Sequence, residues 1–334
     1  MEAQALFREV APRVVGLGVR HRRRTAGDNV DLSTMVGSVS MASPVLTAAG
    51  TAGFATELSQ WVDLASLGAV VVKSLSPDPW AGNAAPRVHG TDGGMINAVG
   101  LQNPGVDAWI ANDLSRLKAT GALVVASIWG FRVEEYALAA SGLARVADQL
   151  AAVEVNVSCP NLEDRRHMFG HSSDGTSAVV RAVRELLPST PIWIKLSPNV
   201  TSVVDIAGAA LNAGADALVL INTVMGMVID VETGKPALGN GGGGLSGPAI
   251  RPVAVRAIYD VRAAFPDAVI VGVGGVSRGE HCVELLMAGA NAVEVGTASF
   301  ANPAAAGNVL AELTDWCRAH HVRRVADLVS KAHH

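Results

Sequence analysis

Short runs of Val, Ile, Leu and Ala alternate along most of the chain with longer stretches in which apolar residues recur three and four positions apart. The short runs are typical of buried parallel strands, and the longer stretches are typical of helices with one apolar face. We predict eight strands, at Val45–Ala49, Ala69–Lys73, Leu123–Ile128, Ala152–Val157, Ile192–Leu196, Ala217–Ile221, Val269–Gly272 and Ala292–Val295. We predict helices between them at Val106–Lys118, Glu134–Ser141, Thr176–Leu187, Val203–Ala213, Arg251–Ala264 and Gly279–Ala288.

This order of elements predicts an α/β fold with a single closed (β/α)8 TIM barrel, because eight strands with intervening helices fit a barrel better than an open doubly wound sheet. No change in composition along the 334 residues marks a second domain. We expect the barrel to span residues 36–334, after an N-terminal extension of residues 1–35 that we expect to be helical. The segments Ser74–Leu101 and Asn161–Gly175 are predicted to be long active-site loops, since loops after barrel strands build the active-site face.

Composition and charge narrow the class of protein. The formal net charge of -4 gives no sign of a nucleic-acid partner. No run of about 18 apolar residues occurs, so we expect no transmembrane segment, and the N-terminus lacks the pattern of a signal peptide. The few, widely spaced cysteines form no CxxC pair, so no metal site or iron–sulfur cluster is expected within this chain. They also favour a reducing, cytoplasmic location over a secreted disulfide framework.

Glycine-rich turns follow the last two predicted strands. Val273-Gly274-Gly275-Val276 follows one strand, and Gly296-Thr297 follows the next. In a barrel these two loops commonly bind a phosphate through backbone N–H groups, and glycine lets the backbone approach the anion closely. Each turn alone is also compatible with an ordinary tight connection from strand to helix. Together, at the ends of the closing strands, they predict a phosphate site.

A cysteine lies between two asparagines at the end of a middle strand, in the segment Asn156-Val157-Ser158-Cys159-Pro160-Asn161. The two amides can hold a flat polar heterocycle, and a thiol, whose ordinary pKa is about 8.5, becomes a useful base when it is activated. A lone cysteine here would more simply be a small buried side chain. The whole Asn-x-x-Cys-Pro-Asn arrangement favours Cys159 as a catalytic base.

Further polar side chains gather at the other strand ends. Lys73 and Lys195 each end an apolar run, where a buried lysine is costly unless it meets an anion, although either one alone could extend to the barrel rim. Asn97 lies in the loop after Lys73, and Asn222-Thr223 ends another strand. With the two asparagines beside Cys159, these amides would surround one barrel mouth. They suit a ring that carries carbonyl and N–H edges.

These residues stand in motifs that resemble those of the class 1 dihydroorotate dehydrogenases, most closely the class 1B catalytic subunit. The resemblance runs from about Ser40 to Asn302. Ordered matches of this length are improbable by chance. The most specific stretches are Met95–Gly105, Asn156–Asn161, Lys195–Val200, Ile221–Thr223, Gly243–Ile250 and Gly296-Thr297.

The resemblance implies an FMN-dependent oxidation of (S)-dihydroorotate to orotate in pyrimidine biosynthesis. Cys159 would take a proton from C5 of the substrate, and hydride would pass from C6 to N5 of FMN. The implied substrate-binding residues are Lys73, Asn97, Gly100, Leu101, Asn156, Asn161, Asn222 and Thr223. The implied cofactor-binding residues are Ala49, Gly50, Lys73, Ser74, Ser127, Asn156, Lys195, Ile221, Gly247, Gly274, Gly275, Gly296 and Thr297.

The resemblance also implies partners. Class 1B subunits usually pair with a second chain that carries FAD and an iron–sulfur cluster and passes electrons to NAD, and the family commonly forms homodimers. We expect both for this chain, while fumarate and a quinone stay open as electron acceptors. Class 2 relatives are membrane-associated and have serine in place of the cysteine, so Cys159 favours the soluble class.

Three positions depart from the family pattern. The family usually has serine where Ala49 stands, glycine where Ser74 stands, and often asparagine where Ser127 stands. Each position is expected beside the flavin ring, so the flavin contacts or the substrate could differ. Three alternatives stay open: a flavin oxidoreductase that acts on another dihydropyrimidine, a flavin-free barrel that serves as a binding or regulatory subunit, and a flavin-free phosphate-sugar enzyme such as an aldolase or isomerase. The last would explain the glycine turns but not the asparagines around Cys159. Asn161 favours orotate, because dihydropyrimidine-reducing relatives usually have histidine there.

Overall fold

Eight parallel strands close into a barrel in the computed structural model, which describes residues 30–158 and 168–333. The strands neighbour one another in chain order, and the last pairs with the first to close the sheet. They are β3 (Val45–Thr47), β4 (Val70–Val71), β7 (Val124–Ile128), β8 (Ala152–Asn156), β9 (Ile192–Leu196), β10 (Ala217–Leu220), β15 (Ile270–Val273) and β16 (Ala292–Val295). The predicted (β/α)8 barrel and its eight strands are confirmed.

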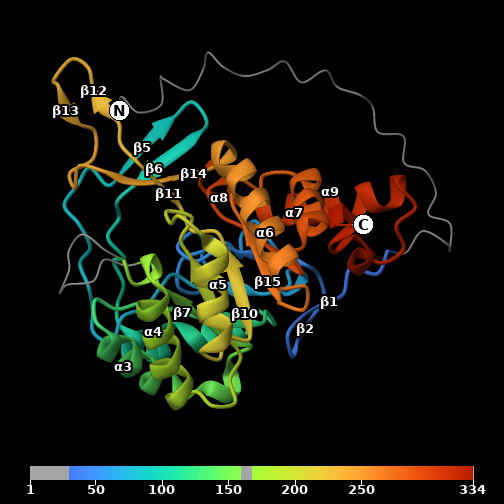
Figure 1. Cartoon of the computed structure of the whole chain (residues 1–334), viewed down its shortest axis with the longest axis horizontal. Helices are drawn as coiled ribbons and strands as arrows, with labels where there is room; N and C mark the ends of the chain where they lie inside the picture. The colour runs from blue at the N-terminus through green and yellow to red at the C-terminus, as the bar shows by residue number, and fades with distance from the viewer. Residues whose placement is uncertain (1–29, 159–167, 334) are drawn as a thin grey trace.

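Helices surround the barrel (Figure 1). The α-helices are α1 (Val106–Trp109), α2 (Ser115–Lys118), α3 (Val133–Ala144), α4 (Ser173–Leu186), α5 (Val203–Asn212), α6 (Arg251–Ala264), α7 (Gly279–Ala288), α8 (Ala298–Ala301) and α9 (Ala305–Ala319). A π-helical turn, η2 (Ile110–Leu114), joins α1 to α2 within the predicted helix Val106–Lys118. Short 3-10 helices are η1 (Leu64–Ser66), η3 (Ala147–Gln149), η4 (Phe169–His171), η5 (Pro248–Ile250), η6 (Val325–Leu328) and η7 (Lys331–His333).

Two apolar cores follow from the alternation of side chains along each strand, as a barrel buried on both faces requires. On β9, Ile192 and Ile194 pack in the layer between strands and helices, whereas Trp193 packs inside the barrel. Most of the interior is apolar. Close to the carboxyl ends of the strands the interior positions become polar, with Ser127, Glu154, Lys195 and Glu294.

An antiparallel hairpin of β1 (Thr34–Val36) and β2 (Val39–Met41) closes the amino-terminal end of the barrel. Val36, Val39 and Met41 belong to the same buried cluster as Trp193, so the hairpin extends the interior core from below. Residues 1–29 lie outside the described part of the chain. The boundary near residue 35 and the helical N-terminal extension therefore stay predictions.

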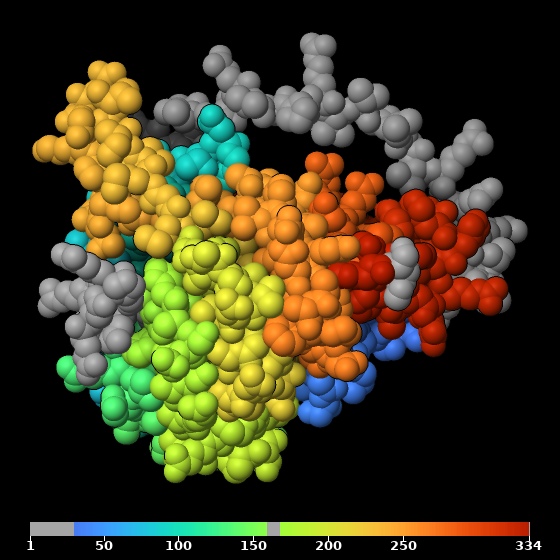
Figure 2. All heavy atoms as spheres, in the orientation of Figure 1, coloured from blue at the N-terminus to red at the C-terminus, as the bar shows by residue number. Residues whose placement is uncertain are grey.

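A four-stranded antiparallel sheet lies over the opposite, carboxyl end of the barrel (Figure 1). Its order is β11 (Val224–Gly226), β14 (Gly243–Ser246), β6 (Gly94–Asn97) and β5 (Val88–Thr91). The segment Ser74–Leu101, predicted as a loop, thus supplies two of its strands. A further hairpin of β12 (Ile229–Asp230) and β13 (Lys235–Pro236) projects from this end at the upper left of Figure 2. None of the described helices has the length and apolar character that crossing a membrane would require.

Candidate active site

A cavity of about 1500 Å³ lies between the carboxyl ends of the barrel strands and the four-stranded sheet. Residues at the strand ends line one side, and residues of β6, β11 and β14 line the other. Pockets for one small ligand usually hold about 300–1,000 Å³. The cavity therefore has room for a cofactor and a substrate together.

The predicted site residues converge on this cavity. Among those that the structure describes, all except Ser127 line it. The substrate set present is Lys73, Asn97, Gly100, Leu101, Asn156, Asn222 and Thr223. Lys73 and Asn156 also belong to the predicted cofactor-binding set. Its other members on the cavity wall are Ala49, Gly50, Ser74, Lys195, Ile221, Gly247, Gly274, Gly275, Gly296 and Thr297. Cys159 and Asn161 lie outside the described residues, although Ser158, which precedes Cys159, lines the cavity.

Only part of the predicted loop Asn161–Gly175 is described. Met168 lines the cavity, whereas Phe169 is buried, with its ring 5.7 Å from that of Tyr136 in an edge-to-face contact. Phe169 therefore belongs to the buried core and does not line the cavity.

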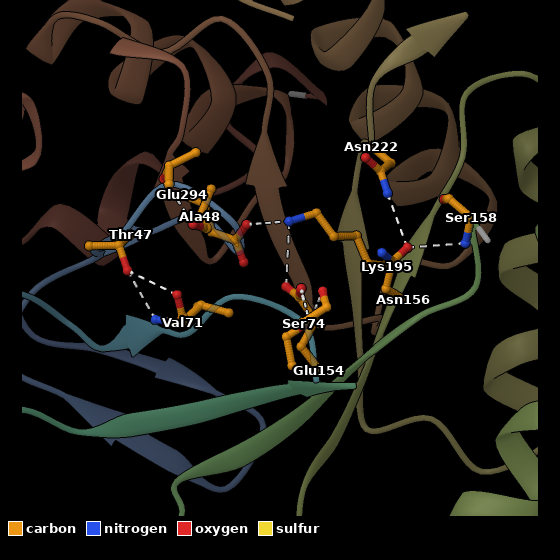
Figure 3. Close-up of polar contacts among 12 residues, drawn as sticks. Thr47, Ala48, Val71, Ser74, Glu154, Asn156, Ser158, Lys195, Asn222 and Glu294 are labelled. Atoms are coloured by element: carbon orange, nitrogen blue, oxygen red, sulfur yellow. Dashed lines mark hydrogen bonds and ion pairs between the residues drawn. The ribbon is translucent and has the colours of Figure 1, made fainter. Parts of the chain in front are cut away.

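Amide side chains from three strand ends form a connected group on the cavity wall. Asn156, at the end of β8, accepts hydrogen bonds at Oδ1 from Asn222 Nδ2 (3.1 Å) and from the backbone N–H of Ser158 (3.1 Å), as Figure 3 shows. Asn199, after β9, donates from Nδ2 to the carbonyl oxygen of Thr223 (3.0 Å). These bonds fix the amides in advance, which lowers the entropy cost of binding a polar ligand.

An aromatic group supports the mouth of the cavity next to Gly100. Trp80, Trp129 and Phe131 meet edge to face, and the rings of Trp129 and Phe131 lie 4.7 Å apart between centroids. Trp80 Nε1 also donates to the carbonyl oxygen of Gly100 (2.8 Å). The Gly100 segment is thereby held against a rigid apolar support.

Lys73, which follows β4, is half-buried on the cavity wall. Its ammonium lies 5.8 Å from the centroid of the Phe54 ring. Burial lowers the pKa of Lys73, and the positive charge of Arg87 lowers it further. An anionic group bound in the cavity would offset both effects, which makes Lys73 a suitable partner for a carboxylate.

The glycine turns after β15 and β16 meet the segment before α6. A Cβ atom added to Gly275 would lie 3.0 Å from the carbonyl oxygen of Gly247, so these two backbones are in close contact. Thr297 Oγ1 donates to Ser246 Oγ (2.7 Å) and ties the Gly296 turn to β14. Backbone groups from three segments therefore converge at one place on the cavity wall.

A buried ionic group lies under the cavity (Figure 3). Lys195 Nζ is 2.8 Å from Glu294 Oε2 and 3.6 Å from Glu154 Oε2. Burial alone would lower the pKa of Lys195, but the two carboxylates outweigh it and raise that pKa. Burial and the charge of Glu154 raise the pKa of Glu294 well above its usual range, against the opposing effect of Lys195.

Ser127 is the predicted cofactor residue that the structure places away from the cavity. Its side chain is fully buried, and its hydroxyl lies 2.8 Å from the hydroxyl of Ser74 and donates to Glu154 Oε1 (3.1 Å). Ser74 itself lines the cavity, whereas Ser127 does not. Ser127 is thus linked to the cavity wall by its hydrogen bond with Ser74.

Several site residues were not predicted from the sequence, chiefly Glu154, Glu294 and Asn199. Glu154 and Glu294 each occupy the third position of an identical Ala-Val-Glu-Val run. A carboxylate inside a buried apolar run is energetically unfavourable unless it is paired. A glutamate within each of these runs could therefore have been recognised from the sequence as a candidate for a buried ion pair. Asn199 follows β9 in the way that Asn222 follows β10, so the strand-end argument applies to it as well.

Comparison with known proteins matches this site to one family. A family model described as dihydroorotate dehydrogenase matches residues 31–316. The chain is 48% identical over 304 residues to the catalytic subunit of dihydroorotate dehydrogenase B (NAD(+)) from Desulforudis audaxviator (strain MP104C), covering 91% of this chain and 98% of that subunit.

Two further relatives carry the same name. The subunit from Geobacter sp. (strain M21) is 44% identical over 299 residues, covering 90% of this chain and 97% of the relative. The subunit from Trichlorobacter lovleyi (strain ATCC BAA-1151 / DSM 17278 / SZ) is 45% identical over 298 residues, covering 89% and 97%. These matches confirm the predicted resemblance to class 1B catalytic subunits, and the chain belongs to the dihydroorotate dehydrogenase family.

Proposed function

We propose that this chain oxidises dihydroorotate to orotate, with FMN and substrate held together in the cavity. The observation that carries the proposal is the convergence of Lys73, a hydrogen-bonded amide group and the glycine turns on one cavity large enough for two ligands. The family membership and the names of the relatives support the reaction.

The family is flavin-dependent, and we infer that the flavin is FMN. A cradle for a flat cofactor is supported by Gly50, which lines the cavity and where an added Cβ would meet no atom within 4 Å, so that any side chain would occupy cavity space. Backbone N–H groups of the Gly274, Gly275 and Gly296 turns would hold the phosphate. When bound, FMN supplies the hydride acceptor, and the protein supplies orientation and charge.

The substrate would lie against Lys73 and the amides. Its carboxylate suits the Lys73 ammonium, and its ring carbonyl and N–H edges suit the side chains of Asn97, Asn156 and Asn222. Cys159 directly follows Ser158 in the sequence, and Ser158 lines the cavity. We propose that its thiolate removes the C5 proton, with Asn161 beside it supporting the substrate.

The names of the relatives also bear on partners. Because they are catalytic subunits of an NAD(+)-linked enzyme, we propose that this chain works with a separate electron-transfer subunit that carries FAD and an iron–sulfur cluster. Homodimer formation and a cytoplasmic location stay predictions.

Anaerobic reduction of the purified yellow protein by dihydroorotate tests the proposed function. We expect the flavin absorbance at about 450 nm to bleach with dihydroorotate, while dihydrouracil leaves it unchanged because it lacks the carboxylate that Lys73 would bind. Bleaching by dihydrouracil alone would favour the other dihydropyrimidine reaction. Protein that never contains flavin would favour the binding-subunit alternative.

Gly275→Ala is expected to reduce FMN retention. Gly275 has a φ of 70°, and an added Cβ would lie 2.7 Å from Arg251 Cβ and 3.0 Å from Arg251 N, so the turn must move away from its position on the cavity wall. The left-handed conformation alone costs roughly 1–2 kcal/mol for alanine, and the crowding adds to this. The ratio of bound FMN to protein after gel filtration measures the effect.

Gly234→Ala is the matched control. Gly234 lies in the β12–β13 hairpin with a φ of 67°, and an added Cβ would meet no atom within 4 Å. It therefore suffers the same backbone strain without the crowding, and its FMN content should stay at the wild-type value. Equal FMN content in the two variants would show that the Gly275 turn does not belong to the cofactor site.

A further inference from the structure

Two carboxyl groups and one ammonium group lie together at the floor of the cavity. Glu154 on β8, Lys195 on β9 and Glu294 on β16 extend into the barrel interior and meet at the Lys195 ammonium (Figure 3). We call these three residues the buried triad. Both carboxyl groups are fully buried, whereas Lys195 is 6% exposed and lines the cavity. Two carboxyl groups therefore share a single ammonium next to the ligand space.

Among the described residues, no other charge inside the barrel compensates for the second carboxylate. The remaining barrel strands, β3, β4, β7, β10 and β15, carry no titratable side chain. Lys73, beyond β4, forms no ion pair with either glutamate. Below the triad the interior is apolar and includes Trp193. If all three groups were ionised, a net charge of about -1 would be buried without a partner, which is costly in a medium of low polarity.

Each of the two carboxyl groups has one oxygen that can carry a proton. Glu154 Oε2 and Glu294 Oε1 have no hydrogen-bond partner among the described residues. A protonated carboxyl group can donate a hydrogen bond, and two carboxyl groups at one site commonly hold one proton between them. The raised pKa of Glu294, caused by burial and by Glu154, agrees with this.

A line of hydroxyl groups joins the triad to the cavity wall. Glu154 Oε1 accepts from Ser127, whose hydroxyl is 2.8 Å from that of Ser74 on the cavity surface. These bonds hold Glu154 in one orientation, and the bond from Lys195 holds Glu294. The position of the ammonium at the cavity floor is therefore determined by both glutamates.

We propose that Glu154 and Glu294 share one proton beside Lys195 and act as positioning residues that set the charge met by a flavin bound above them. The inference rests on the flavin part of the proposed function. With the shared proton, the buried triad is neutral. A more positive triad would favour the reduced cofactor, which carries more negative charge, so the reduction potential reports the charge of the triad.

The test compares the flavin reduction potential of the wild-type holoenzyme with that of Glu294→Gln and of the double variant Glu154→Gln/Glu294→Gln at neutral pH. Glutamine keeps the size of glutamate and cannot ionise. Glu294→Gln leaves the triad neutral, so its potential should match that of the wild type. The double variant leaves Lys195 as an unopposed cation, so the ratio of reduced to oxidised flavin at a fixed potential should rise at least about tenfold, or about 30 mV for two electrons.

Each other outcome overturns the proposal. A raised potential in Glu294→Gln would mean that both carboxyl groups are ionised in the wild type, and an unchanged potential in the folded double variant would mean that the triad charge does not reach the flavin. If the two glutamates had only a structural role, the variants would have a lower melting temperature and a lower FMN content, but the reduction potential would not rise from the single to the double variant. Glu185→Gln, on the exposed face of α4, is the matched control and should change none of these quantities.

Infrared spectroscopy keeps the proposal testable if the double variant does not fold. The wild type should show the band of a buried protonated carboxyl group, and Glu294→Gln should lack it, because the remaining carboxylate then pairs with Lys195 alone. Absence of the band from the wild type would refute the shared proton. Reduction of the wild-type flavin by dihydroorotate is measured separately, so a failure of the proposed reaction and a failure of this inference give different results.

Discussion

Cys159→Ser is expected to lower the rate of flavin reduction by dihydroorotate at neutral pH by at least about 100-fold. General-base catalysis contributes a factor of about 10²–10⁴ to a rate, and at neutral pH a thiol can form the thiolate that acts as the base, whereas a serine hydroxyl hardly ionises. FMN content should stay near that of the wild type, because the two side chains are similar in size. Anaerobic stopped-flow absorbance measures the single-turnover rate, and FMN is quantified on the same sample.

Cys317→Ser provides the matched control for this substitution. Cys317 is buried in α9 within the core between barrel and helices, and burial raises the pKa of its thiol, so it is not a base. Serine there should lower the free energy of unfolding by about 1–3 kcal/mol, since a buried hydroxyl loses its water partners, and should leave the reduction rate intact. A wild-type rate in Cys159→Ser would exclude Cys159 as the base.

Lys73→Ala is expected to weaken dihydroorotate binding roughly 10- to 100-fold and to slow flavin reduction. A hydrogen bond to a charged group contributes about 1.5–3 kcal/mol, and about 1.4 kcal/mol corresponds to a tenfold change in affinity. The reduction rate measured as a function of dihydroorotate concentration separates the binding effect from the rate effect. Lys118→Ala, on the exposed face of α2, is the control and should behave as wild type.

The charge of Lys73 also predicts a pH dependence. Burial and Arg87 lower its pKa, so the free protein loses this positive charge at a lower pH than an ordinary lysine would. Affinity for the anionic substrate should be full below that lowered pKa and should fall as the pH rises through it. If Lys73→Ala keeps the affinity of the wild type at every pH, then Lys73 does not bind the substrate.

The local pattern of apolar and polar residues was sufficient to predict the barrel and most of the residues on the cavity wall. The eight strands are short apolar runs, and a residue that ends such a run in a parallel barrel must lie at the carboxyl end of the sheet. For this reason Lys73, Asn156 and Asn222 were predicted to lie together, and the structure places all three on one cavity. The family membership could likewise be predicted, because its motifs are continuous segments of the chain.

The four-stranded sheet over the barrel was not predicted. Its strands come from two segments far apart in the chain, and β6 pairs with β14 through residues such as Asn97 and Gly244. β14 is rich in glycine, and β5 is exposed, so neither shows an alternation of apolar and polar residues. Strand pairing between distant segments depends on backbone hydrogen bonds that no local pattern reveals.

By itself, the sequence determined the barrel, its strand ends, the identity of the amides, lysines and glycines there, and the family. Only the tertiary structure decided which buried polar groups meet. Strands buried on both faces show the same apolar run whether a given residue faces the helices or the interior, so Ser127 could not be assigned to the layer under Ser74. Glu154 and Glu294 stand in separate strands, and their common contact with Lys195 arises because barrel closure brings β8, β9 and β16 around one narrow interior.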